Sequence, residues 1–443
     1  MKKVIRTCSL FAAILFMATA CSDSLEDIVE QKPTAPSNPM QSIIRTPDEA
    51  LDIANKAVGM FTPSTESRAA NTSKKIDYNQ GAIVCGRSKH SRSTKDTLMY
   101  AVNYCDNQGF VLVSAVRSTP EVIAYIPDGA YDDNAEIDNP GFNFFMDKAN
   151  EYLSNEKNTL SGDDGTITIK PFLPVLAPIY KEFSDTTITV DIPNRVKVLW
   201  SQDGVEGAEC PNQTSGCSIT AAAMAMTYFK FPNSITLTYK EDDPELILDW
   251  GKICKHKNME IYSSYGRDEC DQSTHTAISQ LCRELGHRAN TIYSYNDKGT
   301  GTSPTKTSKL VWALRRLGFT TFTEEYSSQG VINALRNSNS VLLMYGTDAT
   351  QNAAHMWVCD AVKGKKIHRV SYESTDGGMT WHQYFEKTEY LTYNFYNWGW
   401  GYPRCGYYLS DCFDADHPTE SPLKFSSEYN FNSNVNYIIL TQS

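Results

Sequence analysis

Basic residues are too few in this chain for nucleic acid to be its main partner. The 443 residues include 41 Lys and Arg against 52 Asp and Glu, a formal net charge of −11, and no basic stripe with interleaved aromatics is present to bind a phosphate backbone. The sequence also lacks CxxC and HExxH spacings, the usual signatures of zinc sites. We therefore predict no metal site and no cofactor.

Long apolar runs are missing beyond the N-terminus, so no transmembrane helix is expected. Residues 1–20 combine basic residues at the start with a short apolar stretch, as a signal peptide does. Small residues then precede Cys21, a pattern typical of bacterial lipoproteins, in which this cysteine is lipidated; an ordinary secretory signal is the alternative. We expect an exported outer-membrane lipoprotein, on the periplasmic or cell-surface face, held to the membrane by its lipid alone.

The cysteine count is odd once special positions are removed. The chain has twelve cysteines. Cys8 leaves with the predicted signal peptide, Cys21 is the predicted lipidation site, and Cys217 is a candidate for a reactive thiol. The remaining nine could form disulfides in an exported chain, but at least one thiol would stay unpaired.

The length suggests two domains, and the composition divides the chain accordingly. Residues 21–45, after the lipidated cysteine, are rich in Ser, Pro, Gln and acids, as in a flexible tether. Residues 46–169, the N-terminal module, have the pattern of a small α+β unit. Residues 170–195 have many Pro and Thr and little periodicity, which predicts an exposed linker. Residues 196–443, the C-terminal domain, mix an Ala-rich helix with short aromatic strands.

The N-terminal module has clear local signals. A cap, a proline and early acids near Thr46 predict the start of a helix. The apolar segments 97–102 and 109–114 are separated by a turn, which predicts a hairpin. A third strand is expected at 121–125 and a second helix over 142–154.

The strongest pattern in the C-terminal domain is Gly216-Cys217 followed by a run of small and apolar residues with helical character, ending near Phe229. Cys217 is therefore expected at a helix N-terminus, where free N–H groups and the helix dipole favour a thiolate. A thiolate is the nucleophile of cysteine hydrolases. The alternative is a small buried cysteine in an apolar helix.

A cysteine nucleophile needs an imidazole, and the chain has eight histidines. Most lie in polar surroundings, but His355 follows two small alanines and begins the apolar run Met356-Trp357-Val358-Cys359, so we expect it at the start of a buried strand. It lies 138 residues after Cys217, within the range for papain-like chains. Alone, such a histidine would more often be a satisfied core residue.

Two further segments could complete a site. In Asn397-Trp398-Gly399-Trp400-Gly401, an indole could shield a hydrogen bond from a histidine to an Asn side chain or to the backbone, although an aromatic turn in the core is the alternative. Gln202 precedes Cys217 by fifteen residues, and its amide could donate to a developing oxyanion. By itself, it would be a surface residue. The order Gln, Cys, His, Asn-Trp is that of papain.

Four segments resemble the streptopain family of cysteine peptidases in sequence and in order, over residues 196–412. They are Trp200-Ser201-Gln202, Gly216-Cys217 with its helix, His355 with Val358 and Asp360, and Asn397-Trp398-Gly399-Trp400-Gly401. The resemblance implies an α+β fold, in which a papain-like peptidase domain follows a small α+β inhibitory prodomain. The N-terminal module is similar to that prodomain, although Ala115-Val116-Arg117 stands where the family has a Gly-Asp-Asp-like turn.

The resemblance also implies roles for individual residues. Cys217 would be the nucleophile and His355 the general acid and base, with Gln202 at the oxyanion and Trp398 and Asn397 supporting the histidine. Beside the substrate, it implies Ser303, in a loop of small residues, and Ala354, at a position where the family commonly has glycine.

The resulting hypothesis is an exported cysteine endopeptidase, made as a zymogen that its own prodomain inhibits until the linker 170–195 is cut. Its substrates would be proteins or peptides. Two alternatives stay open: a catalytically inactive binding or inhibitory lipoprotein on the same fold, and a Cys-His amidase or acyl transferase.

Overall fold

The computed structural model describes residues 44–61, 74–87, 97–133, 139–161, 179–256, 270–297, 299–337, 339–348, 353–374, 379–401, 404–413 and 435–442. Cys21 and the predicted signal peptide lie outside these residues. The chain divides into two compact units, of which the smaller includes Pro174–Phe183 and Arg369–Glu386. The larger unit holds the N-terminal module and nearly all of the C-terminal domain.

The predicted helices and hairpin of the N-terminal module are confirmed. Its elements are α1 (Pro47–Phe61), β1 (Ala82–Arg87), β2 (Thr97–Asn103), the 3-10 turn η3 (Cys105–Asn107), β3 (Phe110–Ser114), β4 (Val122–Ile126) and α2 (Pro140–Ser161). The start of α1 is a capping box, because the N–H of Glu49 donates to Thr46 Oγ1 and the N–H of Thr46 donates to Glu49 Oε2.

The C-terminal domain holds more helices and longer strands than its sequence predicts. After β5 (Ile179–Ile192), which precedes the domain, its elements are α3 (Cys217–Phe229), β6 (Ser234–Thr236), β7 (Glu245–Ile247), α4 (Trp250–Ile253), α5 (Gln272–Arg288), β8 (Ser294–Tyr295), β9 (Gly301–Thr302), α6 (Thr307–Arg316), β10 (Phe319–Glu325), α7 (Ser328–Arg336), β11 (Val341–Asp348), β12 (Ala353–Ser374), β13 (His382–Asn397), β14 (Gly406–Leu409), η4 (Ser410–Cys412) and β15 (Val435–Gln442).

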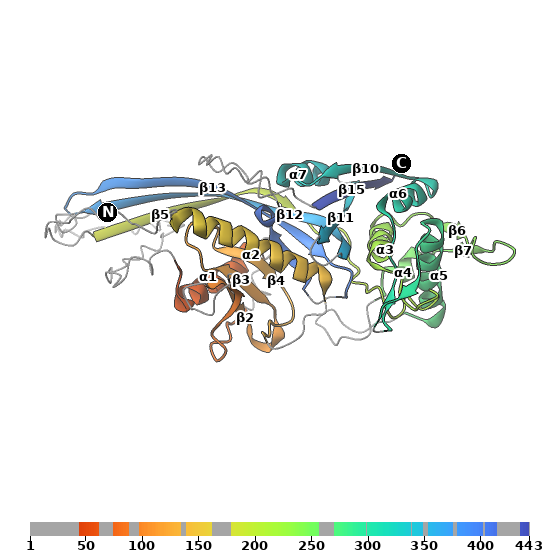
Figure 1. The fold of residues 1–443 in the computed structure, drawn as a ribbon. Coiled ribbons are helices and arrows are strands. Elements are labelled where there is room, and N and C mark those ends of the chain that lie inside the picture. The colour runs from red at the N-terminus through yellow and green to blue at the C-terminus, as the bar shows by residue number, and fades with distance from the viewer. Residues whose placement is uncertain are drawn as a thin grey trace, which may run out of the picture. The chain divides into compact units, whose positions relative to one another are not determined.

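One sheet runs through both parts of the larger unit (Figure 1). Its strand order is β1-β2-β3-β4-β14-β13-β12-β11-β15-β10, with β5 paired to β12. The junction is the antiparallel pair of β4 and β14, in which Tyr407 faces Tyr125 and Tyr408 faces Ala124. The sequence predicts two domains here, but backbone hydrogen bonds join them into one sheet.

The strands β11 and β12 divide their side chains between two hydrophobic cores. Leu343 and Val358 face a core built with α3, α5 and α6. Leu342 and Trp357, one residue away on each strand, face a core that also contains the buried residues of α1 and α2. This alternation follows from the period of two in a strand, so opposite faces of the same strands serve different partners.

Residues 179–192 differ from the predicted linker. They form β5, which pairs with β12, although the side chains of residues 183–189 are exposed. Thr, Ile and Val dominate this segment, and β-branched residues favour extended backbone. Because the alternation of apolar and polar residues is weak where both faces are solvated, periodicity does not reveal this strand.

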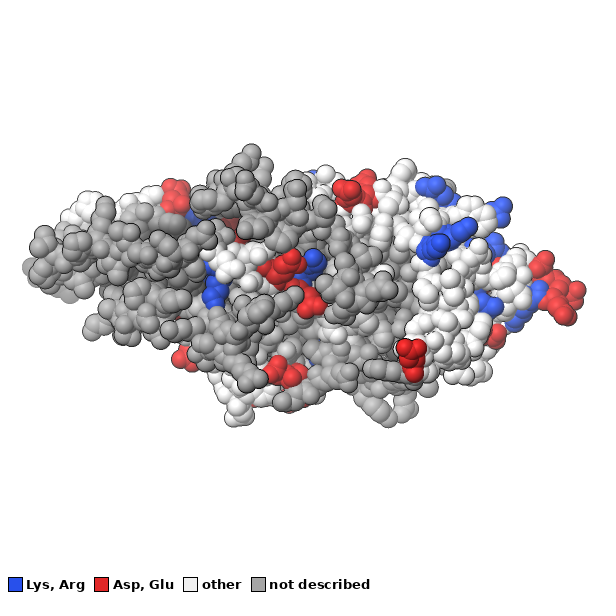
Figure 2. Space-filling view, viewed as in Figure 1, with Lys and Arg blue, Asp and Glu red and all other residues white. Residues whose placement is uncertain are grey.

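The surface carries charges of both signs. Figure 2 shows lysine and arginine side chains interspersed with acidic ones over the end of the molecule that holds α3 to α6. Within the described residues, no helix is long and apolar enough to span a bilayer.

Candidate active site

Cys217 is the first residue of α3, as predicted. The preceding Gly216 has φ +86°, and a Cβ there would lie 2.4 Å from the carbonyl oxygen of Ser303. Only glycine fits such a backbone and such a close approach. The local sequence Gly-Cys thus starts the helix sharply and sets its first residue beside the loop that carries Ser303.

Helix α3 is held in place along its whole length. Residues 218 to 227 are all buried, which explains the run of alanines, since small side chains allow close packing. At its start, the hydroxyls of Ser215 and Thr220 are 2.8 Å apart, and Thr220 Oγ1 donates to the carbonyl of Gly216 at 3.0 Å. The sulfur of Cys217 therefore sits on a rigid support.

The surroundings of Cys217 favour its ionised form. Burial acts to raise the pKa of this thiol, but the charge and hydrogen bond of His355 oppose it, with help from the N–H of Met356 and the hydroxyl of Ser218. The net result is a pKa below the ordinary value of 9.0. A cysteine so placed is a better nucleophile near neutral pH than a free one.

His355 reaches Cys217 from β12, where it pairs with Gly346 of β11. The imidazole is buried, and its Nε2 lies 2.9 Å from the carbonyl oxygen of Trp398. A carbonyl can only accept, so Nε2 carries the proton and Nδ1 is left for the cysteine. The Trp357 ring stacks on the imidazole, with centroids 6.2 Å apart and planes 14° apart.

Asn397 and Trp398 support the histidine through the backbone. Of the two arrangements the sequence allows, the structure has the hydrogen bond to the Trp398 carbonyl rather than to the Asn397 side chain. Asn397 Nδ2 donates to the carbonyl of Val198 at 2.9 Å, and its Oδ1 accepts from the N–H of Gly399 at 3.3 Å. Its amide therefore fixes the turn that aims the Trp398 carbonyl.

Trp398 itself is fully buried. Its Nε1 donates to the carbonyl of Arg404 and to the hydroxyl of Tyr408, at 3.0 and 3.1 Å. Its ring packs against Trp357, with centroids 5.1 Å apart. The two indoles form an apolar wall beside His355, which would strengthen the hydrogen bonds there by excluding water.

The remaining predicted residues lie around the cysteine. The carbonyl of Gln202 accepts from the N–H and the hydroxyl of Ser215, at 2.8 and 3.0 Å. Because Ser215 lies two residues before Cys217, these bonds tie the backbone of Gln202 to the start of α3. Ser303 is buried and donates from Oγ to the carbonyl of Thr214 at 2.8 Å. Ala354 is exposed, directly before His355 on β12.

Helix α2 of the N-terminal module covers the histidine. A Cβ on Gly141 would lie 2.8 Å from Cδ2 of His355 and 2.3 Å from Cε3 of Trp398. One turn later, the Phe144 ring lies so close to Gly346 that a Cβ on this glycine would be 2.7 Å from Cε1 of the ring. Phe145 packs on Tyr408, with centroids 4.5 Å apart. The start of α2 is thus fitted against the imidazole and its aromatic supports.

Some of these residues could not be identified from the sequence. The sequence predicts Trp357 as an ordinary core residue of a strand, and Gly141 lies just before the predicted helix 142–154. The only signal for Trp357 is its spacing, because residues two apart on a strand share a face. For Gly141 the sequence carries no signal, because its role depends on a contact with His355 and Trp398, which are distant in the chain.

The chain is similar in sequence to known proteins. Residues 197–408 match the model of the Peptidase C10 family, and residues 41–153 match that of the Spi protease inhibitor. Two streptopains of Streptococcus pyogenes are 22% and 21% identical over 396 residues, spanning 82% of this chain and 83% of each relative. A solved fragment of Prevotella intermedia prointerpain A shares 18% identity, covers 80% of this chain and 96% of its own, and has a TM-score of 0.46.

Proposed function

We propose that this chain is the precursor of a cysteine endopeptidase, because residues 197–408 match the Peptidase C10 family and residues 41–153 match the Spi protease inhibitor. The observation that carries the proposal is Cys217 at the N-terminus of α3, where His355 lowers the pKa of the thiol against the effect of burial. Proteins and peptides are the substrates.

The reaction follows from the positions of these two groups. The thiolate of Cys217 attacks the peptide carbonyl carbon, and the carbonyl oxygen becomes an oxyanion. The N-terminus of α3 and the Gln202 side chain stabilise that charge with N–H donors. The intermediate collapses as the C–N bond breaks, and the amine leaves with the proton of the His355 imidazolium. A thioester remains on Cys217.

Hydrolysis of the thioester reverses the roles. The now neutral His355 takes a proton from water as the oxygen attacks the acyl carbon. The C–S bond breaks, the carboxylic acid leaves, and the thiolate is restored beside the imidazolium. Throughout, the Trp398 carbonyl holds Nε2–H, so the same Nδ1 faces the sulfur in each step.

The N-terminal module acts as an inhibitory prodomain in this proposal. Its helix α2 lies on His355 and Trp398 through Gly141, which would block one side of the cleft to an extended substrate. Cleavage within residues 170–195, a segment that includes β5, would then separate the N-terminal module from the C-terminal domain. Residues 1–20 would direct export, and lipidated Cys21 would hold the precursor at the outer membrane, as the sequence pattern suggests.

Self-processing tests the proposal directly. Residues 22–443 are expressed with Cys217 or with Cys217→Ala, and both the conversion to a shorter form and the digestion of casein are followed. The native chain should shorten and digest casein, and the variant should do neither. Equal processing of both would remove Cys217 from the mechanism, while thiol-dependent activity on small amides without casein digestion would favour the amidase or acyl transferase.

A binding protein on a decayed peptidase fold is separated by labelling. A thiol-directed epoxide should modify Cys217 in the native chain, and His355→Ala should slow that reaction. An inert Cys217 would favour the binding protein.

A further inference from the structure

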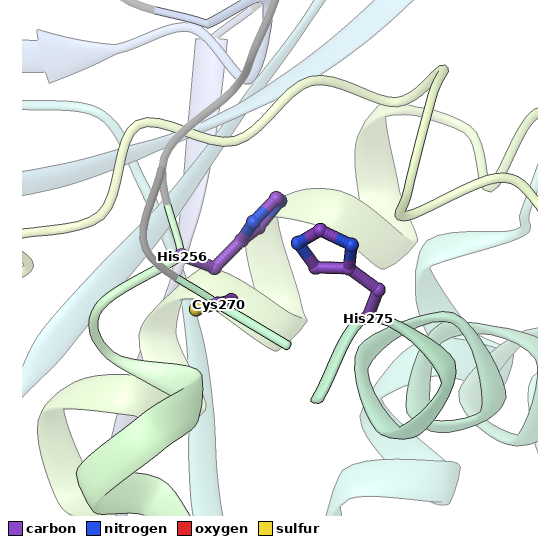
Figure 3. A group of neighbouring side chains, drawn as sticks. All are labelled: His256, Cys270 and His275. Carbon is purple, nitrogen blue, oxygen red and sulfur yellow. The ribbon is translucent and has the colours of Figure 1, made fainter. Parts of the chain in front are cut away.

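A second cluster of chemically competent side chains, separate from the pair of Cys217 and His355, lies at the end of α4 and the start of α5. His256 follows α4, Cys270 precedes α5, and His275 lies in the first turn of α5. One ligand atom from each residue lies within 4.8 Å of the others. In Figure 3 the two imidazole rings lie close together, with Cys270 beside His256.

The donor set is that of a transition-metal site. One thiolate and two imidazoles suit Zn²⁺, which accepts Cys and His in tetrahedral sites and leaves the fourth position to water when only three protein ligands are present. Such a site needs ligand atoms about 3.5 Å apart. Side-chain rotations that move the three atoms together by about 1 Å would supply this geometry. We propose that His256, Cys270 and His275 bind one Zn²⁺ ion.

A buried carboxylate next to the cluster supports the proposal. Glu206 Oε1 lies 3.3 Å from Nε2 of His256, and both side chains are at most 2% exposed. A carboxylate beside a ligating histidine commonly accepts its second N–H and fixes its orientation. The charges also balance, because Glu206 and the Cys270 thiolate together offset the two positive charges of the ion. Without a counter-charge, a buried carboxylate is costly.

The ion would brace the wall that carries Gln202. The ring of Trp200 packs on His256 with centroids 5.9 Å apart, and Glu206 belongs to the loop that continues from Gln202. On its other side this segment is fixed by the carbonyl of Trp200, which accepts from the N–H of Gly401 at 2.9 Å. A metal tie among His256, Cys270 and His275 would hold α4, α5 and this loop together.

The binding test uses residues 22–443 with Cys217→Ala, which removes the reactive thiol and any self-processing. The protein is reduced, freed of metal with a chelator and titrated with Zn²⁺ alone by calorimetry. Co²⁺ then serves as a spectroscopic probe, since a Cys ligand gives a thiolate-to-metal charge-transfer band. We expect one Zn²⁺ per chain, a raised Tm and the Co²⁺ band.

Matched variants assign the ligands. Cys270→Ser and His275→Asn should each abolish the stoichiometric binding and the shift in Tm, and Cys270→Ser should remove the Co²⁺ band. Glu206→Gln should weaken Zn²⁺ binding by about 10- to 100-fold. Cys270 itself donates to the carbonyl of Lys252 at 3.5 Å, a bond that a ligating thiolate gives up. The controls are Cys254→Ser, whose sulfur donates to the carbonyl of Thr227 outside the cluster, and His287→Asn on the exposed side of α5; both should bind as the parent does.

Two results would overturn the proposal. One is the absence of stoichiometric Zn²⁺ binding by the folded parent. The other is unchanged binding when Cys270 or His275 is replaced. Circular dichroism of each metal-free variant separates lost ligands from lost fold, and a variant that fails to fold is replaced by His275→Gln, which retains a side chain of similar size. None of these measurements uses peptidase activity, so they stand apart from the test of Cys217.

Discussion

The two faces of the sheet next to the site differ in which parts of the chain pack on them. On the face toward Cys217, residues such as Leu343 and Val358 pack with α3, α5 and α6, all from the C-terminal domain. On the face behind His355, Trp357 and Trp398 share their core with residues of α1 and α2. The nucleophile thus rests on a core that the C-terminal domain builds alone, whereas the supports of the histidine rest on a shared one.

In the proposed precursor, this difference would allow the enzyme to stay latent with no change in the surroundings of Cys217. A segment packed on the histidine side can block the cleft while α3 keeps its buried helix. Departure of that segment exposes aromatic rings that are now buried, among them Tyr408 and Phe413. Burial of such rings stabilises the docked state by about 1.5–3 kcal/mol each, so release should require cleavage and not thermal opening alone.

The largest expected effect comes from matched truncations on the two faces. Phe145→Ala, in α2, should destabilise the precursor by about 3–5 kcal/mol, and Met224→Ala, in α3, by about 2–5 kcal/mol, since each is fully buried. Only Phe145→Ala should raise the peptidase activity of the uncleaved chain. After processing, Met224→Ala should remain less heat-stable than the parent, whereas the Phe145→Ala product should melt with the parent.

Denaturant unfolding and casein digestion measure both effects. A precursor with Phe145→Ala that is as stable and as latent as the parent would show that the shared core does not hold α2 in place. The comparison of the two faces would then fail.

A smaller effect is expected from one methyl group placed against the histidine. Gly141→Ala puts its Cβ within 2.8 Å of His355 and 2.3 Å of Trp398. The strain should weaken docking of α2 by about 1–3 kcal/mol, and the full chain should process itself faster. Gly59→Ala is the control, because Gly59 lies in α1 with no atom within 4 Å of its added Cβ; it should stabilise the helix by about 0.5–1 kcal/mol.

Time courses of processing by gel electrophoresis compare these two variants. If both process at the rate of the parent, the contact between α2 and the imidazole has no role in latency. The processed products should have equal activity, because residue 141 lies upstream of the linker.

The residues around Cys217 were the more predictable half of the site. The sequence Gly-Cys before a run of small and apolar residues predicts a helix that starts at the cysteine, and α3 begins at Cys217. His355 could be singled out because two alanines precede it and an apolar run follows it in the sequence. These signals work since each arises within about ten residues of chain.

The rest depends on contacts between distant segments. The tie between Asn397 and Val198 spans 199 positions, and no local pattern shows that the Trp398 carbonyl, not the Asn397 amide, would accept from His355. His256 stands between two lysines, which predicts exposure, yet Trp200 and Glu206 bury it. Thirteen residues separate it from Cys270, so the cluster has no compact zinc spacing.

The smallest expected effect links the two halves through the thiol itself. Burial raises the pKa of Cys217, but the charge and hydrogen bond of His355 lower it by more than burial raises it, so the net pKa lies below 9.0. A lowered pKa means that thiolate persists at pH values where an ordinary thiol is protonated. In His355→Ala the opposing effect is lost and burial remains, so the midpoint for alkylation by iodoacetamide should move to higher pH.

Mass spectrometry of the Cys217 peptide, sampled across pH, gives both midpoints. Cys405 is the internal control, because burial raises its pKa to about 12 and it should stay unlabelled while the fold is intact. Equal midpoints in the parent and in His355→Ala would mean that the helix N-terminus alone sets the reactivity of the thiol. Since α3 is fixed by the C-terminal domain, Cys217 would then be activated independently of His355. Latency would have to act by blocking substrate binding rather than by changing the pKa of the thiol.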